Sequence, residues 1–289
     1  MITAATCSKT NARPSSNIGP FIAWVVVVFA LTLIGALPML LQGLNLTSIS
    51  KSTPHLPLVM TGMLVTSCSP TLAALFVAWL YPTAGGHRSV FRGGSVWRVG
   101  LIWYMIALIG PVLLFLAARA IHAARFGAVH AQWMVLPSFS GQGGLPFVIF
   151  GSLFAEEPGW RGFAQPRLQA RYGALVASVF IGFVWSTWHL WYVILPGGFA
   201  NVTGTDAVAT YIRLTSTAVI YAWMYNSTSG SLFLAMTAHL GHNLAASLVP
   251  VPADSGQQHL IIALLYFVAA MIVVFATRPR TLCARTSGD

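Results

Sequence analysis

Eight apolar segments separated by short polar connections limit what this chain can fold into. Only 7% of the 289 residues are charged and 56% are hydrophobic, whereas an ordinary soluble domain is about 25% charged. Several segments approach or exceed the ~18 apolar residues that indicate a membrane-spanning helix. We therefore expect an all-α polytopic membrane protein with about eight transmembrane helices, at 18–41, 57–80, 99–118, 145–157, 174–195, 208–225, 231–249 and 259–277.

The polar ends of the chain and its basic residues predict the domain organisation. Residues 1–17 are polar and are expected to be a disordered segment; residues 18–277 would form a single transmembrane domain, and 278–289 a basic tail. With eight spans, eleven of the fifteen Lys and Arg residues fall on the side that holds both ends of the chain. This asymmetry predicts that the N- and C-termini are cytosolic. Because the basic residues are spread over short loops, the net charge of +10 does not indicate nucleic-acid binding.

The chain has five acidic residues, and its only two glutamates, Glu156 and Glu157, are adjacent. A carboxylate at membrane depth costs at least ~2.5–3.5 kcal/mol on insertion scales, so it needs a partner or a function. Arg161, four residues after Glu157, provides a partner at helical spacing. Pro158 disfavours helical geometry at Glu157, however, which predicts a break there and weakens the argument for that pair. A structural ion pair at the end of a span is the simplest interpretation.

Two further polar clusters lie inside apolar segments. His189 is in the fifth segment, and His239 and Asn243, four residues apart in the seventh, project from one face of a helix. Each cluster alone would be explained by hydrogen bonds between packed helices. Together they suit peptide hydrolysis, because a carboxylate can activate water while an imidazole or an amide stabilises the oxyanion. A zinc site with an open position for water is also plausible, with Glu156, His189 and His239 as ligands.

The same residues leave two other classes of protein open. In a proton- or cation-coupled transporter, the relay would consist of Glu156, Glu157, His189 and His239. The amide of Asn243 favours the hydrolase, because a relay has no special need for an amide there. A scaffold that binds membrane peptides without cutting them has no use for these costly polar residues. Ser152 lies near the glutamates without an activating arrangement, and we interpret it as a packing residue.

The order of these motifs resembles a known family. Glu-Glu-x-x-x-Arg at 156–161, Trp-His-Leu at 188–190 and His-x-x-x-Asn at 239–243 are similar to the motifs of the CAAX protease and bacteriocin-processing family of intramembrane endopeptidases. The resemblance covers roughly residues 145–248, which would be the protease core, and it implies an active site inside the helix bundle. The family usually has Phe four residues before the histidine of the second motif. This chain has Trp185 there, so we expect the packing role to survive with an altered pocket shape.

The resemblance also implies a role for each polar group. The implied catalytic set is Glu156, Glu157, Arg161, His189, His239 and Asn243. The first glutamate would be the general base, its neighbour and the arginine would orient and stabilise it, and the first histidine would position the water. The second histidine and the asparagine would stabilise the oxyanion. The substrate would be a membrane-associated or lipidated protein or peptide precursor. The family has been described both as glutamate-dependent and as metal-dependent, so a divalent metal such as zinc remains a possible cofactor.

Overall fold

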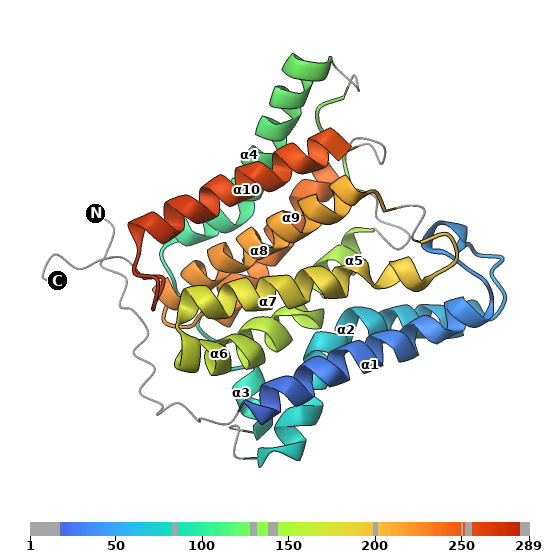
Figure 1. The fold of residues 1–289 in the computed structure, drawn as a ribbon, viewed down its shortest axis with the longest axis horizontal. Coiled ribbons are helices and arrows are strands. Elements are labelled where there is room, and N and C mark those ends of the chain that lie inside the picture. Colours follow the sequence, from blue (N-terminus) through green and yellow to red (C-terminus); the bar gives the residue numbers. More distant parts are fainter. Residues whose placement is uncertain are drawn as a thin grey trace, which may run out of the picture.

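The computed structural model describes residues 18–82, 86–127, 132–137, 144–198, 202–249, 251 and 256–283, and it confirms the all-α architecture (Figure 1). The helices are α1 (Gly19–Leu41), α2 (Leu56–Leu80), α3 (Gly86–Val90), α4 (Leu101–Phe126), α5 (Leu145–Phe150), α6 (Gln165–Tyr172), α7 (Ala174–His189), α8 (Gly204–Ser227), α9 (Leu232–Leu248) and α10 (Gly256–Ala276). Two π-helical segments, η3 (Gly151–Ala155) and η4 (Pro158–Ala164), connect α5 to α6. Two 3₁₀ segments are η1 (Leu46–Ser48) and η5 (Leu190–Ile194). The segment predicted to be disordered, 1–17, lies outside the described residues.

Five of the described helices are long and apolar enough to cross a membrane, namely α1, α2, α4, α7 continued by η5, and α10. The chain is therefore an integral multi-pass membrane protein. The three other predicted spans correspond to the irregular α5–η3 segment, to α8, which contains Arg213, and to α9, which is 17 residues long. The total of about eight spans stays a prediction. Two of these three elements carry the glutamates and His239.

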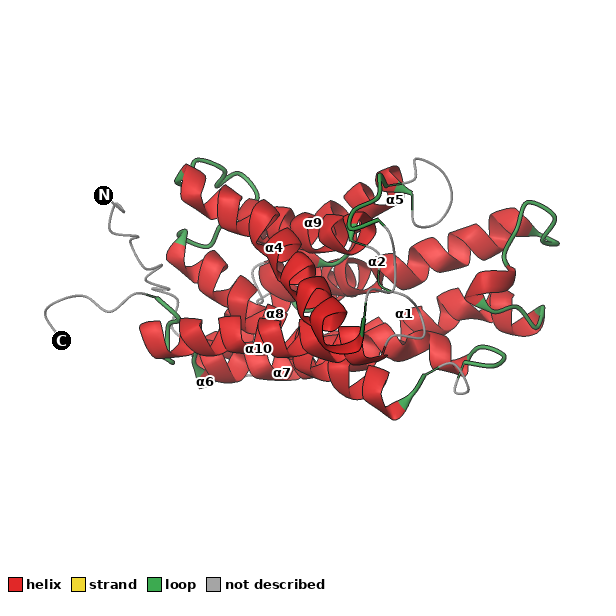
Figure 2. Cartoon of the chain, turned by 90° about the horizontal axis from the view of Figure 1, so that it is seen from above, coloured by secondary structure: helices red, strands yellow, loops and turns green. Residues whose placement is uncertain are grey.

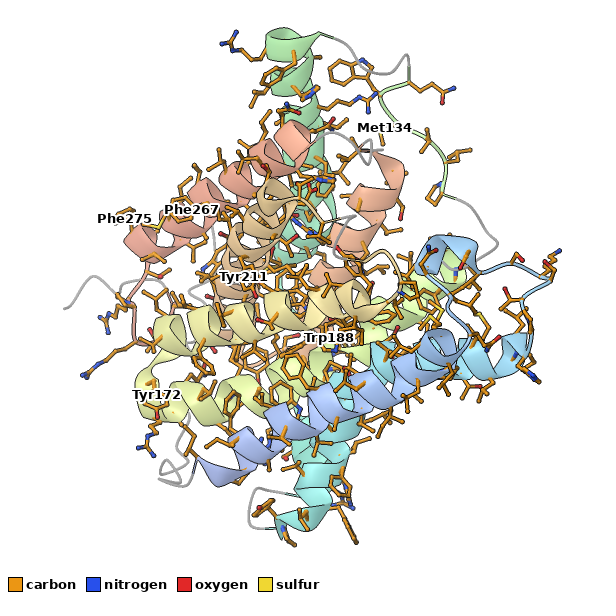
Figure 3. All side chains as sticks on the ribbon, turned by 45° about the vertical axis from the view of Figure 1, so that its right-hand side comes forward. Met134, Tyr172, Trp188, Tyr211, Phe267 and Phe275 are labelled. Atoms are coloured by element: carbon orange, nitrogen blue, oxygen red, sulfur yellow. The ribbon has the colours of Figure 1, made fainter. Side chains whose placement is uncertain are left out.

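The outer faces of the long helices are apolar. Phe267 and Phe275 project outward from α10 (Figure 3), and their side chains are 47% and 73% exposed. Val26 and Leu33 of α1 are exposed to a similar extent. Soluble monomers rarely present extended apolar surface of this kind. These faces therefore suit contact with lipid.

The polar elements lie inside the bundle of long helices. α1 packs along α2, and α8 packs against α7 and α10 and makes smaller contacts with α9. Figure 2 shows α8 between α9 on one side and α7 and α10 on the other. The two π-helical segments contact α2 and α9. The segment that holds the glutamates is thus enclosed by helices from both halves of the chain.

Close backbone contact fixes α9, the helix that carries two histidines. A Cβ atom on Gly241 would collide with the carbonyl oxygen of Ala107 in α4. Small residues at such positions let helices in a membrane approach closely. Because Gly241 lies between His239 and His242, this contact fixes the position of both imidazoles along the α9 axis relative to α4.

The first residues of the basic tail pack against the start of α7. The N–H groups of Ala174 and Leu175 donate to the carbonyls of Arg280 and Pro279, both at 2.9 Å. The side chain of Leu282 is fully buried. These contacts satisfy N–H groups that the first turn of a helix otherwise leaves unpaired.

Candidate active site

The two glutamates lie where two π-helical segments meet. Glu156 follows η3 with φ −118° and ψ −54°, and Glu157 precedes η4 with helical angles, φ −60° and ψ −34°. The predicted break at Glu157 is therefore wrong by one residue. Pro158 is the first residue of η4, where a missing N–H is tolerated, so the irregularity falls on Glu156 instead. π-helical turns of this kind occur frequently at functional sites.

Glu157 is the centre of a buried polar network. Its Oε1 accepts a hydrogen bond from Nη1 of Arg161 at 3.1 Å and another from Nδ1 of His239 at 2.9 Å. The side chains of Glu157 and Arg161 are fully buried, and His239 is 3% exposed. The ion pair expected from the spacing of four residues is present. Nδ1 of His239 donates to Glu157, so Nε2 on the other side of the ring carries no proton when the imidazole is neutral.

The carboxylate of Glu156 faces that nitrogen. Oε1 of Glu156 lies 3.8 Å from Nε2 of His239, a separation that one water molecule can bridge. Oε2 accepts a hydrogen bond from the indole N–H of Trp185 at 2.7 Å and a longer one from Trp160 at 3.4 Å. Unlike Glu157, Glu156 keeps 12% of its side chain exposed. Glu156 is therefore the glutamate that a substrate can reach.

Aromatic rings surround the charge of Arg161. Its guanidinium lies 4.9 Å from the centres of the rings of Trp185 and Tyr221, an arrangement that stabilises a desolvated cation. Nε and Nη2 of Arg161 and the hydroxyl of Tyr221 have no hydrogen-bond partner among the described residues. The positive charge of Arg161 is thus stabilised by the carboxylate of Glu157 and by the ring faces of Trp185 and Tyr221.

His189 and Asn243 occupy the more exposed edge of the site. Nδ1 of His189 lies 3.0 Å from the carbonyl oxygen of Trp185, and the imidazole packs against the Trp185 ring at 5.5 Å. The same indole lies 5.5 Å from His239, so one ring separates the two histidines. The side-chain amide of Asn243 donates to the hydroxyl of Ser152 at 2.9 Å. The interpretation of Ser152 as a packing residue is therefore incomplete, because Ser152 also orients this amide.

His242, which lies one turn after His239, faces a different part of the bundle. Nε2 of His242 is 2.6 Å from Nη1 of Arg213 in α8, and Nδ1 is 2.7 Å from the hydroxyl of Tyr266 in α10. The six predicted site residues therefore form a buried group around Glu157 and a neighbouring edge, and His242 belongs to neither. The sequence analysis expected Trp185 to pack at the site, but it did not anticipate the hydrogen bond from Trp185 to Glu156 or the contacts of Tyr221. The unusual Trp185 was the one signal in the sequence that pointed to them.

Glu156, His189 and His239 were considered from the sequence as zinc ligands. Nδ1 of His239 is engaged by Glu157, and Nδ1 of His189 is directed at a backbone carbonyl. Within the described ranges, no group of three or more His, Cys, Asp and Glu side chains is arranged to hold a metal ion.

Fold and site together define a helical membrane protein with a polar centre of two glutamates, histidines and an asparagine. Residues 143–245 match the family model described as type II CAAX prenyl endopeptidase Rce1-like. A curated relative, CAAX prenyl protease 2 of Methanococcus maripaludis, is 28% identical over 157 residues, which are 52% of this chain and 57% of that protein. The match to the relative thus spans little more than half of its length. The resemblance inferred from the motifs is confirmed, and the matched residues include all six predicted site residues.

The hydrogen bond from Trp185 to Glu156 leads to a first prediction. Trp185→Phe keeps an aromatic ring but removes a donor to a carboxylate, an interaction worth about 1.5–3 kcal/mol. We expect kcat for peptide cleavage to fall about 10- to 100-fold with little change in KM. Trp188→Phe is the matched control, because the Trp188 N–H donates to Thr32 and Ser69 instead; Figure 3 shows Trp188 inside the bundle. Equal losses of kcat in the two variants would show that the bond to Glu156 has no special role.

Proposed function

We propose that this chain is an intramembrane endopeptidase in which Glu156 activates a water molecule for attack on a peptide bond. The observation that carries the proposal is the distance of 3.8 Å between Oε1 of the partly exposed Glu156 and Nε2 of His239. A water between them can donate one hydrogen bond to each, which places its oxygen for attack. The similarity to CAAX prenyl endopeptidases supports the same class of reaction.

The proposed steps follow from these contacts. Water oxygen attacks the scissile carbonyl carbon while Glu156 takes one water proton, which gives a tetrahedral oxyanion. Glu156 then passes that proton to the amide nitrogen as the carbon–nitrogen bond breaks, leaving a new carboxyl group and a new amine. Asn243 has a second amide hydrogen, besides the one directed at Ser152, that can stabilise the oxyanion. His189 lines the edge at which the water enters.

Glu157 and Arg161 act through His239 in this proposal. Glu157 fixes the imidazole in the form with hydrogen on Nδ1, and Arg161 donates a hydrogen bond to the same carboxylate oxygen. This differs from the role implied by the family resemblance, in which His239 stabilises the oxyanion directly. A neutral His239 orients the water, and it would donate to an oxyanion only after gaining a proton at Nε2.

The substrate and the orientation complete the proposal. The name of the curated relative specifies a prenyl protease, and the apolar outer faces support a position of this site within a bilayer. We therefore propose a membrane-associated, lipid-modified protein or peptide as substrate, a single transmembrane domain at 18–277, and cytosolic N- and C-termini. A transporter relay is not favoured by the comparisons.

The decisive experiment compares protein termini in membranes and medium from cells that carry either the wild type or Glu156→Gln. We expect a set of new C-termini that appear only with the wild type, and these would identify the substrates. Identical termini, with both proteins equally abundant and folded, would contradict the peptidase. Ion flux through vesicles would then be the next measurement.

A further inference from the structure

The two glutamates lie on a segment that cannot be a regular helix. In a regular helix, the carbonyl of Phe154 would accept a hydrogen bond from the N–H of the fourth residue after it, but that residue is Pro158, which has no N–H. Glu156, between η3 and η4, departs from helical angles with φ −118°. The position of its carboxylate therefore depends on contacts that neighbouring helices make with this segment.

Helix α2 makes such a contact just before the glutamates. The hydroxyl of Thr71 donates to the carbonyl of Phe154 at 3.2 Å, a contact between residues 83 apart in sequence. The side chain of Thr71 is 7% exposed, so this hydrogen bond is largely shielded from water. Thr71 thus gives the carbonyl of Phe154 a donor that Pro158 cannot provide.

A second contact with α2 lies just after the glutamates. A Cβ atom on Gly159 would collide with the backbone carbonyl of Pro70, the residue before Thr71. The same carbonyl of Pro70 accepts a hydrogen bond from the indole N–H of Trp24 in α1 at 2.9 Å. Two consecutive residues of α2 therefore hold the chain on both sides of Glu156 and its neighbour.

Helix α1 reaches Glu156 through aromatic rings. The fully buried ring of Trp24 packs edge-on against Trp160, with 5.0 Å between the ring centres. The N–H of Trp160 is the longer of the two indole donors to Glu156, at 3.4 Å. Both α1 and α2 precede residue 143, where the match to the family model begins. A part of the chain outside that match therefore contacts the segment that carries the glutamates.

We propose that Thr71 is a positioning residue whose hydrogen bond to Phe154 holds the carboxylate of Glu156 at the distance from His239 that one water molecule can bridge. This proposal rests on the proposed function, and it gives the α1–α2 pair a part in catalysis besides crossing the membrane. The distance to be kept is the 3.8 Å between Oε1 of Glu156 and Nε2 of His239. Because a misplacement of about 1 Å can slow a reaction about 100-fold, even a small shift of this segment would lower the rate.

The test compares Thr71→Val with Thr71→Ser in purified protein reconstituted into vesicles that contain a membrane-anchored peptide. Valine keeps the shape of threonine without its hydroxyl, so kcat per folded enzyme should fall about tenfold. KM should stay within about twofold of the wild type, since no group that binds the substrate is removed. Serine keeps the hydroxyl and should restore most of the wild-type kcat.

Thr66→Val is the matched control, because Thr66 is a buried threonine of the same helix whose hydroxyl donates to the carbonyl of Thr32 in α1 at 3.3 Å. This variant loses a hydrogen bond between helices but none to the glutamate segment, so its kcat per folded enzyme should stay within about twofold of the wild type. Equal losses of kcat in Thr71→Val and Thr66→Val would overturn the proposal, as would a wild-type kcat in Thr71→Val. A Thr71→Ser variant as slow as Thr71→Val would overturn it too.

Amide hydrogen exchange in detergent micelles tests the same contact without any cleavage. Thr71→Val should speed the exchange of residues 151–164 about tenfold and leave α8 and α10 unchanged, whereas Thr66→Val should not change the exchange of 151–164. A wild type that cuts no peptide would reject the proposed function. Exchange would then decide whether Thr71 holds the segment, and equal exchange in the wild type and Thr71→Val would reject that role.

Discussion

Glu156→Gln in purified protein reconstituted into vesicles is expected to cut a peptide substrate about 10²- to 10⁴-fold more slowly than the wild type. Glutamine has nearly the same shape, and its amide oxygen can still accept the hydrogen bond from Trp185. It cannot take a proton from water, so the loss should appear in kcat while KM stays nearly constant. Single-turnover cleavage of a labelled peptide measures this directly.

Asp206→Asn provides the control for this substitution. It makes the same change of carboxylate to amide at an acidic residue that pairs with His259 at the start of α8. The rate of this variant should stay within about twofold of the wild type. A Glu156→Gln variant that keeps more than one tenth of the wild-type rate would mean that another group removes the proton from water.

Glu157→Met is expected to lower the free energy of unfolding by about 3–5 kcal/mol, because it leaves Arg161 fully buried without its anion. Activity should also be lost, since His239 loses the acceptor that fixes its Nδ1–H. Reversible unfolding in mixed detergent micelles measures the stability, and peptide cleavage by the folded fraction measures the activity.

The double variant Glu157→Met with Arg161→Met separates these two effects. Replacement of a buried ion pair by apolar side chains is often close to neutral for stability, so the double variant should recover most of the lost free energy. It should remain inactive, because the imidazole is still unanchored. Recovery of both stability and cleavage would show that the pair is structural and that His239 needs no carboxylate partner.

The sequence predicted the fold class because hydropathy alone determines it. Apolar runs of the length of α1 and α10 have few alternatives to a membrane helix. The irregular segment around Glu156 was harder, because the effect of Pro158 on the preceding residue competes with its tolerance at the first position of a helix. A rule that considers only neighbouring residues does not decide which of these two effects of Pro158 prevails. The packing of η3 and η4 against α2 and α9 decides it.

The residue types of the site could be predicted from the sequence, but most of the hydrogen-bond partners of these residues could not. The spacing of four residues suggested that Glu157 pairs with Arg161, although Pro158 weakened that argument. That His239 shares the same oxygen of Glu157 depends on the packing of α9 against the π-helical segments, a contact 82 residues apart in sequence. The indole bond from Trp185 to Glu156 and the separate grouping of His242 with Arg213 likewise depend on long-range packing.

The oxygen that Glu157 shares between Arg161 and His239 also bears on when the protein becomes reactive during its synthesis. Arg161 is supplied by the same segment as Glu157, but His239 arrives on a helix made much later. Until α9 is inserted, Nε2 of His239 cannot face Glu156, and the pair proposed to orient the water is incomplete. On the proposed mechanism, hydrolysis would therefore begin only after α9 has packed against the segment that carries the glutamates.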